Sequence, residues 1–224
     1  MSGGIWCVIP IKDLENAKTR LAPALSPKER RGLFQAMAED VLAAAAGARG
    51  LAGVLVLTND ARAAALAGRF EARIESEPAN VGQSEAVARA AGILKREGAD
   101  GILTLPADAP LTTPSEIERM LARHPNDRPA MTIAPDHAER GSNCLILTPG
   151  DLIPLHFGHV SFQPHLAEAR AIGIEPTIVR DVPGIALDVD TPEDLQAALA
   201  TGRSTKAMTF AREHGIAERL SSGR

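Results

Sequence analysis

Short apolar runs rich in β-branched residues alternate along most of the chain with longer, alanine-rich segments. We predict strands at residues 5–10, 54–58, 72–76, 101–105, 130–135, 144–147, 176–180 and 185–189. We predict helices near residues 27–46, 61–67, 83–96, 114–123, 162–172 and 192–201. This alternation is typical of an α/β fold in which helices cover both faces of a mostly parallel sheet.

Three predicted helices begin with a hydroxyl residue, then proline, with an acidic residue three positions after the hydroxyl. They start at Ser26, Thr113 and Thr191. The hydroxyl can accept a hydrogen bond from a free N–H of the first turn, the acid can reach back to the cap, and proline is tolerated at the first helical position. The segment before such a cap is expected at the carboxyl end of a strand, where open α/β sheets usually bind ligands.

The composition indicates a globular protein with an aliphatic core. Of its 224 residues, 45% are hydrophobic and only 3% aromatic, and the formal net charge is −4. A chain this acidic, with few aromatic side chains to stack on bases, is not expected to bind nucleic acid. We expect one domain over residues 1–202, followed by a tail, residues 203–224, with one short helix near residues 206–214.

Two further features bear on the compartment. The cysteines, Cys7 and Cys144, each lie in an apolar run, so we expect reduced core residues and no disulfide. The N-terminus does not resemble a signal peptide, and no segment has the apolar length of a membrane span. We therefore expect a cytoplasmic protein without a membrane partner.

A basic loop follows the first predicted strand. Lys12, Lys18 and Arg20 come within nine residues, directly after Pro10. Such a cluster can hold polyanionic phosphates, and Arg adds bidentate geometry. An ordinary solvated loop is the alternative. The chain has neither a P-loop nor a dinucleotide-binding glycine motif, so a nucleotide would be held in another way.

Three aspartates are placed where a metal ion could bind. Asp108 follows a strand and lies between two prolines, and Asp188 and Asp190 are two residues apart on a predicted strand, so they would point to the same side. Like charges this close favour a cation between them, and Mg²⁺ prefers carboxylate and phosphate oxygens. The alternatives are a turn for Asp108 and helix capping for Asp190, which leave Asp188 without a role.

Glycines and hydroxyls mark three further loops. Ser142 lies in one, Gly158 and Ser161 in another at a helix start, and Gly82 in a third before an alanine-rich helix. Backbone N–H groups at a helix start, together with a hydroxyl, can bind an anion, and the Gly82 loop could approach a base or ribose; plain turns are the alternative. The histidines at 156, 159 and 165 have irregular spacing and no nearby cysteine, so we expect no zinc site.

Taken in order, these segments resemble the guanylyltransferases of coenzyme F(420) biosynthesis, which act on 2-phospho-L-lactate, phosphoenolpyruvate or 3-phospho-D-glycerate. The matching segments are VIPIK at 8–12, AKTRLAP at 17–23, LPAD at 105–108, GSN at 141–143, FG at 157–158, SF at 161–162 with His165, and ALDVDTP at 186–192. They cover the chain from about residue 5 to 200. Two departures are Gly82-Gln83-Ser84, where Gly-Leu-Asn is usual, and Ser142, where Thr is commoner.

The resemblance implies a three-layer, GT-A-like and Rossmann-like nucleotidyltransferase fold. It implies transfer of GMP from GTP to a phosphorylated three-carbon acid, with release of pyrophosphate. Lys12, Lys18 and Arg20, with Pro10 and Gly82, would bind the nucleotide, and the acceptor phosphate would lie at Ser142, Gly158 and Ser161. The three aspartates, 108, 188 and 190, would hold Mg²⁺. The catalytic residues would be Asp108 together with Lys12, Lys18 and Arg20, which would stabilise the charge on the departing pyrophosphate.

Several alternatives remain open from the residues alone. A related nucleotidyltransferase could act on molybdopterin or a sugar phosphate, and a non-catalytic nucleotide-sensing module would bind GTP without releasing pyrophosphate. A glycosyltransferase with a DxD motif is disfavoured because Asp188 and Asp190 come late in the chain. The sequence does not choose the acceptor, the number of metal ions or the oligomeric state, for which a homodimer is one option.

Overall fold

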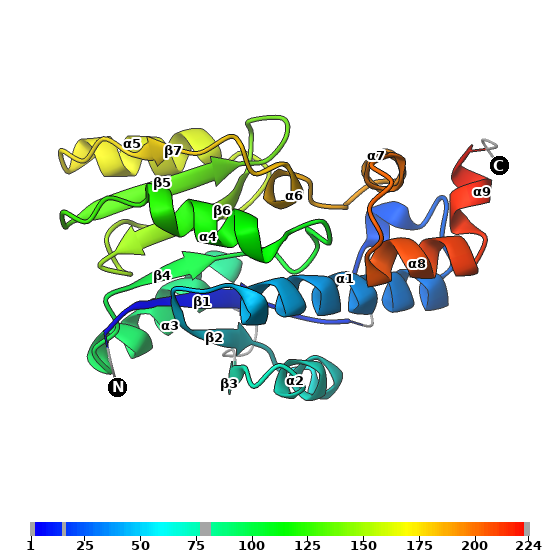
Figure 1. The fold of residues 1–224 in the computed structure, drawn as a ribbon, viewed down its shortest axis with the longest axis horizontal. Coiled ribbons are helices and arrows are strands. Elements are labelled where there is room, and N and C mark those ends of the chain that lie inside the picture. The colour runs from blue at the N-terminus through cyan, green and yellow to red at the C-terminus, as the bar shows by residue number, and fades with distance from the viewer. Residues whose placement is uncertain (1–2, 15–16, 77–81, 222–224) are drawn as a thin grey trace.

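The computed structural model describes residues 3–14, 17–76 and 82–221. Its centre is a seven-stranded sheet with the strand order β3-β2-β1-β4-β6-β5-β7 (Figure 1). The strands are β1 (Ile5–Pro10), β2 (Leu51–Leu57), β3 (Arg73–Glu75), β4 (Gly101–Thr104), β5 (Ala130–Pro135), β6 (Ser142–Thr148) and β7 (Thr177–Ile178). All neighbours pair in parallel except β6, which is antiparallel to both β4 and β5. The predicted α/β fold with a mostly parallel sheet is confirmed.

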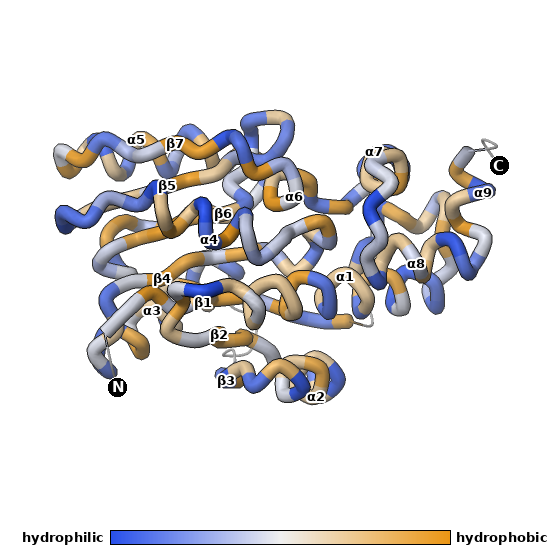
Figure 2. Tube along the Cα trace, viewed as in Figure 1, coloured by the Kyte–Doolittle hydropathy of each residue, from blue (hydrophilic) through white to orange (hydrophobic). Residues whose placement is uncertain are grey.

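Helices cover both faces of this sheet. They are α1 (Pro27–Gly47), α2 (Ala61–Gly68), α3 (Gln83–Arg96), α4 (Pro114–Arg123), α5 (Phe162–Ala171), α6 (Pro183–Ala186), α7 (Pro192–Ala200), α8 (Lys206–Glu213) and α9 (Ile216–Ser221), with a 3₁₀ helix, η1, at Thr19–Leu21. Complete capping boxes begin α1, α4 and α7 at Ser26, Thr113 and Thr191, as predicted. Several helices carry both hydrophobic and hydrophilic residues, as expected for helices with one buried face (Figure 2).

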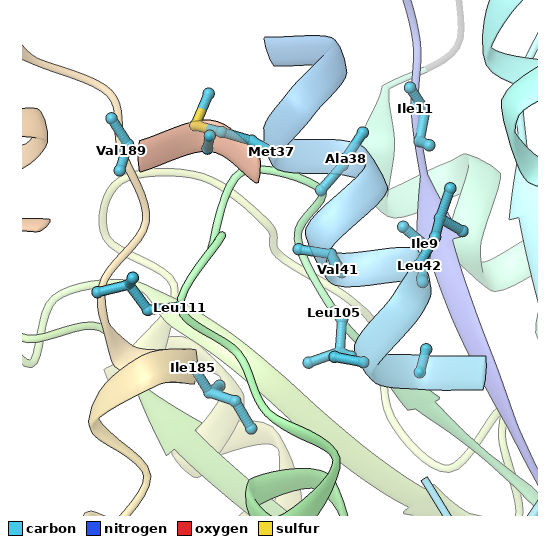
Figure 3. Packing of buried hydrophobic residues seen from close by; sticks show 14 of the residues in the cluster. Ile9, Ile11, Met37, Ala38, Val41, Leu42, Leu105, Leu111, Ile185 and Val189 are labelled. Carbon is cyan, nitrogen blue, oxygen red and sulfur yellow. The ribbon is translucent and has the colours of Figure 1, made fainter. Parts of the chain in front are cut away.

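Alternate residues of the central strands enter two separate cores. In β1, Cys7 and Ile9 join one cluster and Val8 joins the other. The first core contains side chains of α1, such as Met37 and Val41, and Figure 3 shows these two on the side of α1 toward Val189 and Leu105. The second contains side chains of α3 and α5. Burial on both faces explains why these strands are continuous apolar runs. Cys7 and Cys144 are buried and free, as expected, and burial raises the pKa of both thiols.

The predicted strand at residues 185–189 is wrong. Residues 183–186 form the short helix α6, and residues 187–190 belong to no strand. The apolar side chains of Ile185 and Val189 are buried in the first core without belonging to a strand. The Val189 N–H donates to the Asp108 carbonyl (2.9 Å) and not to a neighbouring strand. A short apolar run signals burial, and periodicity alone does not distinguish a strand from a buried turn of helix.

The antiparallel direction of β6 determines what lies at one edge of the sheet. Thr104 at the end of β4 pairs with Leu145, so the first residues of β6 extend past the carboxyl end of β4. The beginning of β6 therefore meets the carboxyl ends of β1 and β4 at a single edge.

The C-terminal segment forms two helices, α8 and α9, where one was predicted. Helix α8 packs on α1, and its first turn is held by Asp40, which accepts from the N–H groups of Lys206 and Ala207 (both 2.9 Å). Met208 and Ile216 are fully buried in the first core. Among the described residues, no helix combines the length and apolar character that crossing a bilayer requires.

Candidate active site

The candidate site lies at the edge of the sheet where β1 and β4 end and β6 begins. A polar cavity of about 410 Å³ opens there. It is lined by both acidic and basic side chains, namely Arg20, Asp136, His137, Arg140, His159, Asp188, Asp190, Thr191 and Asp194. This is the edge at which open α/β sheets bind ligands.

Lys18 connects two of the predicted aspartates. Its backbone has a left-handed conformation (φ 59°), and only 5% of its side chain is exposed. Its Nζ donates to Asp190 Oδ1 (2.6 Å) and to Asp108 Oδ2, and lies 5.7 Å from the centre of the Phe34 ring. Burial alone would lower the pKa of Lys18, but the charges and hydrogen bonds of both carboxylates outweigh it, so the pKa is raised. Lys18 is therefore a buried ammonium ion at neutral pH.

Asp190 is paired with two cations. Arg20 Nη1 lies 3.6 Å from Asp190 Oδ2, in addition to the contact from Lys18. Burial would raise the pKa of Asp190, but Lys18 and then Arg20 lower it further than burial raises it, so the carboxylate stays ionised. The Arg20 guanidinium also contacts His159 Nε2, which links η1 to the loop before α5.

Asp188 is held by an amide instead of a cation. Its Oδ1 accepts from Asn143 Nδ2 (3.0 Å), which also donates to the carbonyl of Ile185 (3.0 Å). Burial, and then the charge of Asp108, raise the pKa of Asp188. Asp108 Oδ1 is buried and has no hydrogen-bond partner in the described part of the chain. Two carboxylates that repel each other, one with an unpartnered oxygen, are suited to an added cation.

The donor set fits a hard divalent cation, which prefers carboxylate oxygens. However, among residues 3–14, 17–76 and 82–221 no three His, Cys, Asp or Glu side chains are grouped closely enough to hold a metal ion. The ammonium group of Lys18 instead joins Asp108 to Asp190.

The predicted hydroxyl residues form a second group. The Ser142 N–H donates to Ser161 Oγ (2.9 Å). Because Ser161 is the N-cap of α5, this hydrogen bond joins the start of β6 to the start of α5. Ser142 Oγ and His165 Nδ1 are 2.9 Å apart. Gly158 has a φ of 153°, which favours glycine, and a Cβ there would meet no atom within 4 Å. The loop that contains it is anchored to α3, since the Phe157 N–H donates to Ser84 Oγ (2.8 Å).

The structure thus brings together Lys18, Arg20 and the three aspartates, and it also brings Ser142 to Ser161. Of the predicted residues, Arg20, Asp188 and Asp190 line the cavity, whereas Lys18, Asp108, Ser142, Gly158 and Ser161 are not part of its lining. Three others belong to neither of these groups in the described part of the chain. Lys12 is exposed on the loop after β1, Pro10 ends β1, and Gly82 is exposed before α3. Part of the predicted Gly82 loop, residues 80 and 81, lies outside the described residues.

Three residues for which the sequence predicted no role also lie here. Asn143 orients Asp188, His159 contacts Arg20, and Arg140 lines the cavity. In the described part of the chain the Arg140 guanidinium makes no ion pair or hydrogen bond, unlike Arg20. Arg140 and Asn143 are within two residues of the predicted Ser142, but which side chains they approach depends on the direction of β6.

Comparison with known proteins gives one family. Residues 5–223 match the family model described as guanylyl transferase CofC like. The phosphoenolpyruvate guanylyltransferase of Conexibacter woesei is 37% identical over 192 residues, covering 86% of each chain. The 2-phospho-L-lactate guanylyltransferase of Methanothermobacter thermautotrophicus is 34% identical over 206 residues, covering 92% of this chain and 89% of that one.

Solved structures share the fold at low sequence identity. A protein from Desulfovibrio desulfuricans G20 aligns with a TM-score of 0.79 at 16% identity, covering 98% of this chain and 99% of that chain. A cytidylyltransferase from Leptospira borgpetersenii aligns with a TM-score of 0.63 at 13% identity, covering 99% and 96%. The nucleotidyltransferase fold expected from the sequence is confirmed.

Proposed function

Because the chain belongs to the family of CofC-like guanylyl transferases, we propose that it transfers GMP from GTP to a phosphorylated three-carbon acid and releases pyrophosphate. The observation that supports this most directly is the juxtaposition of two unlike groups at one edge of the sheet. One is the cluster of Lys18, Arg20 and the three aspartates, and the other is the pair of hydroxyls at Ser142 and Ser161. A transferase that joins two phosphorylated substrates needs two such neighbouring sites.

We assign phosphoenolpyruvate as the first acceptor to test, because the relative from C. woesei bears that name. The second acceptor to test is 2-phospho-L-lactate, because the relative from M. thermautotrophicus bears that name. The third is 3-phospho-D-glycerate. Coenzyme F(420) biosynthesis, the pathway expected from the sequence resemblance, is part of this proposal.

The reaction requires alignment and charge neutralisation more than acid–base catalysis. An oxygen of the acceptor's phosphate is already anionic, so it can attack the α-phosphorus of GTP without a general base. The bond from the α-phosphorus to the bridging oxygen breaks, and pyrophosphate leaves with the electron pair. Lys18 and Arg20 are the cations placed to stabilise the charge that builds on pyrophosphate. We keep Lys12, Pro10 and Gly82 as proposed contacts of GTP.

We propose that Asp108, Asp188 and Asp190 hold Mg²⁺. The ion would neutralise and polarise phosphate oxygens of the substrates when bound. The residues that prepare this site are Asn143, which orients Asp188, and Lys18, which keeps Asp108 and Asp190 together.

We place the acceptor phosphate at Ser142, Gly158 and Ser161. Hydroxyls and backbone N–H groups bind phosphate without neutralising the charge that the nucleophile needs. The acceptor also carries a carboxylate. Arg140, two residues before Ser142, lines the polar cavity and has no ionic partner among the described residues. A guanidinium suits a carboxylate because the two can form paired hydrogen bonds.

The test is pyrophosphate release with GTP and Mg²⁺, with each of the three acids offered separately. We expect release with at least one acid and loss of turnover in Asp188→Asn, with the fold retained. Asp151→Asn is the matched control, because Asp151 forms an exposed ion pair with Lys95. Folded protein that binds GTP but turns over none of the three acids would overturn the proposed acceptor class. Normal rates in Asp188→Asn would overturn the metal assignment.

A further inference from the structure

His165 of α5 is a buried histidine whose two ring nitrogens both have partners. Its side chain is shielded from solvent, with 0% of the residue exposed. Its Nε2 lies 2.9 Å from the backbone N of His156, and its Nδ1 lies 2.9 Å from Ser142 Oγ. The ring of Phe157 meets the imidazole edge-on, with 5.4 Å between ring centres.

These partners fix the tautomer of His165. A backbone N–H can only donate, so Nε2 must accept with its lone pair. A neutral imidazole with a free lone pair on Nε2 has its proton on Nδ1, and Nδ1 therefore donates to Ser142 Oγ. Burial, and then the charge of His156, lower the pKa of His165 to about 4, and the opposing effect of Glu168 is smaller. His165 is consequently neutral at physiological pH.

The tautomer of His165 determines whether the Ser142 hydroxyl can donate a hydrogen bond to a ligand. Its oxygen accepts from His165, and its backbone N–H is already donated to Ser161 Oγ. The hydroxyl proton of Ser142 is then available for another acceptor. Within residues 3–14, 17–76 and 82–221 the one hydrogen-bond partner of Ser142 Oγ is His165 Nδ1. Because Ser142 is only partly buried, this proton can reach a bound ligand.

We propose that His165 is a positioning residue that fixes the Ser142 hydroxyl as a hydrogen-bond donor toward the acceptor's phosphate. The inference rests on the proposed placement of the acceptor at Ser142. With the opposite tautomer, Ser142 would donate to His165 and turn a lone pair toward a phosphate dianion, which would repel it.

A first test reads the tautomer directly and needs no activity. Two-bond ¹H–¹⁵N correlation spectra of the imidazoles at pH 7 distinguish the two neutral forms. We expect His165 to carry its proton on Nδ1. A proton on Nε2, or rapid exchange between both nitrogens, would overturn the inference whatever reaction the enzyme catalyses.

A second test is a double-mutant cycle with phosphoenolpyruvate or the acid found active. A hydrogen bond to a charged group contributes enough that His165→Leu should raise the acceptor KM about tenfold or more, with the KM for GTP unchanged. Ser142→Ala should have a similar effect, and the double variant should be no worse than Ser142→Ala. His165→Asn, whose amide can still donate, should recover part of the loss. Additive effects of the two substitutions, or equal changes in both KM values, would refute the role of His165.

The chain provides a matched control in His124. Like His165, it has a partner on each ring nitrogen, but here both partners are hydroxyls, Thr132 Oγ1 and Thr148 Oγ1 (both 2.9 Å). Its pKa is also lowered to about 4, chiefly by burial. Thr148 ends β6, whereas Ser142 begins it, so His124 lies at the opposite edge of the sheet. His124→Leu should lower the melting temperature as His165→Leu does but leave the acceptor KM unchanged. An equal rise of the acceptor KM in both variants would show a general loss of structure and overturn the specific role.

Discussion

At the residue scale, the site depends on how a few charges are paired. Lys18 is almost completely buried, and such a charge is stable only beside compensating charges, here Asp108 and Asp190. Arg20 is half-exposed and shares Asp190. One oxygen of Asp108 has no hydrogen-bond partner among the described residues, and burial and the charge of Asp108 raise the pKa of Asp188. The negative charge of these two carboxylates is therefore not fully compensated. These pairings are consistent with the proposal that the cluster binds a further cation and phosphates.

Lys18→Met tests this pairing. The substitution keeps the aliphatic stem over Phe34 but removes the ammonium ion, so kcat/KM should fall about 10²–10³-fold, as for loss of one preorganised donor. Lys95→Met, at an exposed ion pair with Asp151, is the control and should retain wild-type rates. Steady-state pyrophosphate release measures both. If the two variants were equally active, Lys18 would have no role in the reaction.

At the element scale, the segment with Asp188 and Asp190 is positioned by neighbouring helices and not by a strand ladder. Glu116 of α4 is 3% exposed, and its Oε1 accepts from the Gly184 N–H of α6 (2.6 Å). Its Oε2 accepts from the Thr113 N–H (3.0 Å) as part of the capping box of α4. A Cβ on Gly184 would meet the carbonyl oxygen of Leu111 at 2.1 Å, so only glycine fits this close approach. One carboxylate therefore caps α4 and fixes the turn that leads to Asp188.

Glu116→Gln should show this double role. The amide NH₂ of glutamine would face one of the two N–H donors, leaving a buried group unsatisfied at a cost of about 1–3 kcal/mol. Urea denaturation should show the loss, together with a lower kcat. Glu118→Gln, on the same helix but paired with exposed Arg49, should be nearly neutral. A Glu116 variant as stable as the Glu118 variant would contradict the bridging role.

At the scale of the whole molecule, the sheet, its two helical layers and the C-terminal helices form a continuous structure. Helices α7, α8 and α9 lie at one end of the molecule (Figure 1). Met208 and Ile216 share the first core with β1, and Arg219 pairs with Glu29 of α1 (2.6 Å). The division into residues 1–202 and a tail stays a prediction, and these contacts show how the tail is attached.

The buried histidine also affects global stability. The pKa of His165 falls from its ordinary 6.5 to about 4 in the folded protein, so between these values the unfolded chain binds more protons. The free energy of unfolding should therefore decrease as pH falls from 6.5 toward 4, by at most about 1.4 kcal/mol per pH unit for this group. Urea midpoints at pH 7 and pH 5 should differ less in His165→Leu than in the wild type, in which His156 and Glu168 face the same ring. An identical pH dependence in both proteins would contradict a neutral, buried His165.

The sequence by itself determined the α/β class, the capped helices and most strands, because these depend on local periodicity and on hydroxyl–proline caps. It also predicted Lys18, Arg20 and Asp108 as site residues, because charged residues that follow apolar strands lie where open sheets bind ligands. The structure brings these three side chains together with Asp190, and their role in the reaction stays a prediction. Only the tertiary structure decided that residues 185–189 are not a strand, because burial produces the same apolar pattern in a short helix. It alone decided that β6 runs antiparallel, which brings Asn143 to Asp188 and Ser142 to His165. These contacts join residues 23 to 45 positions apart, and no local pattern encodes which partner a strand will choose.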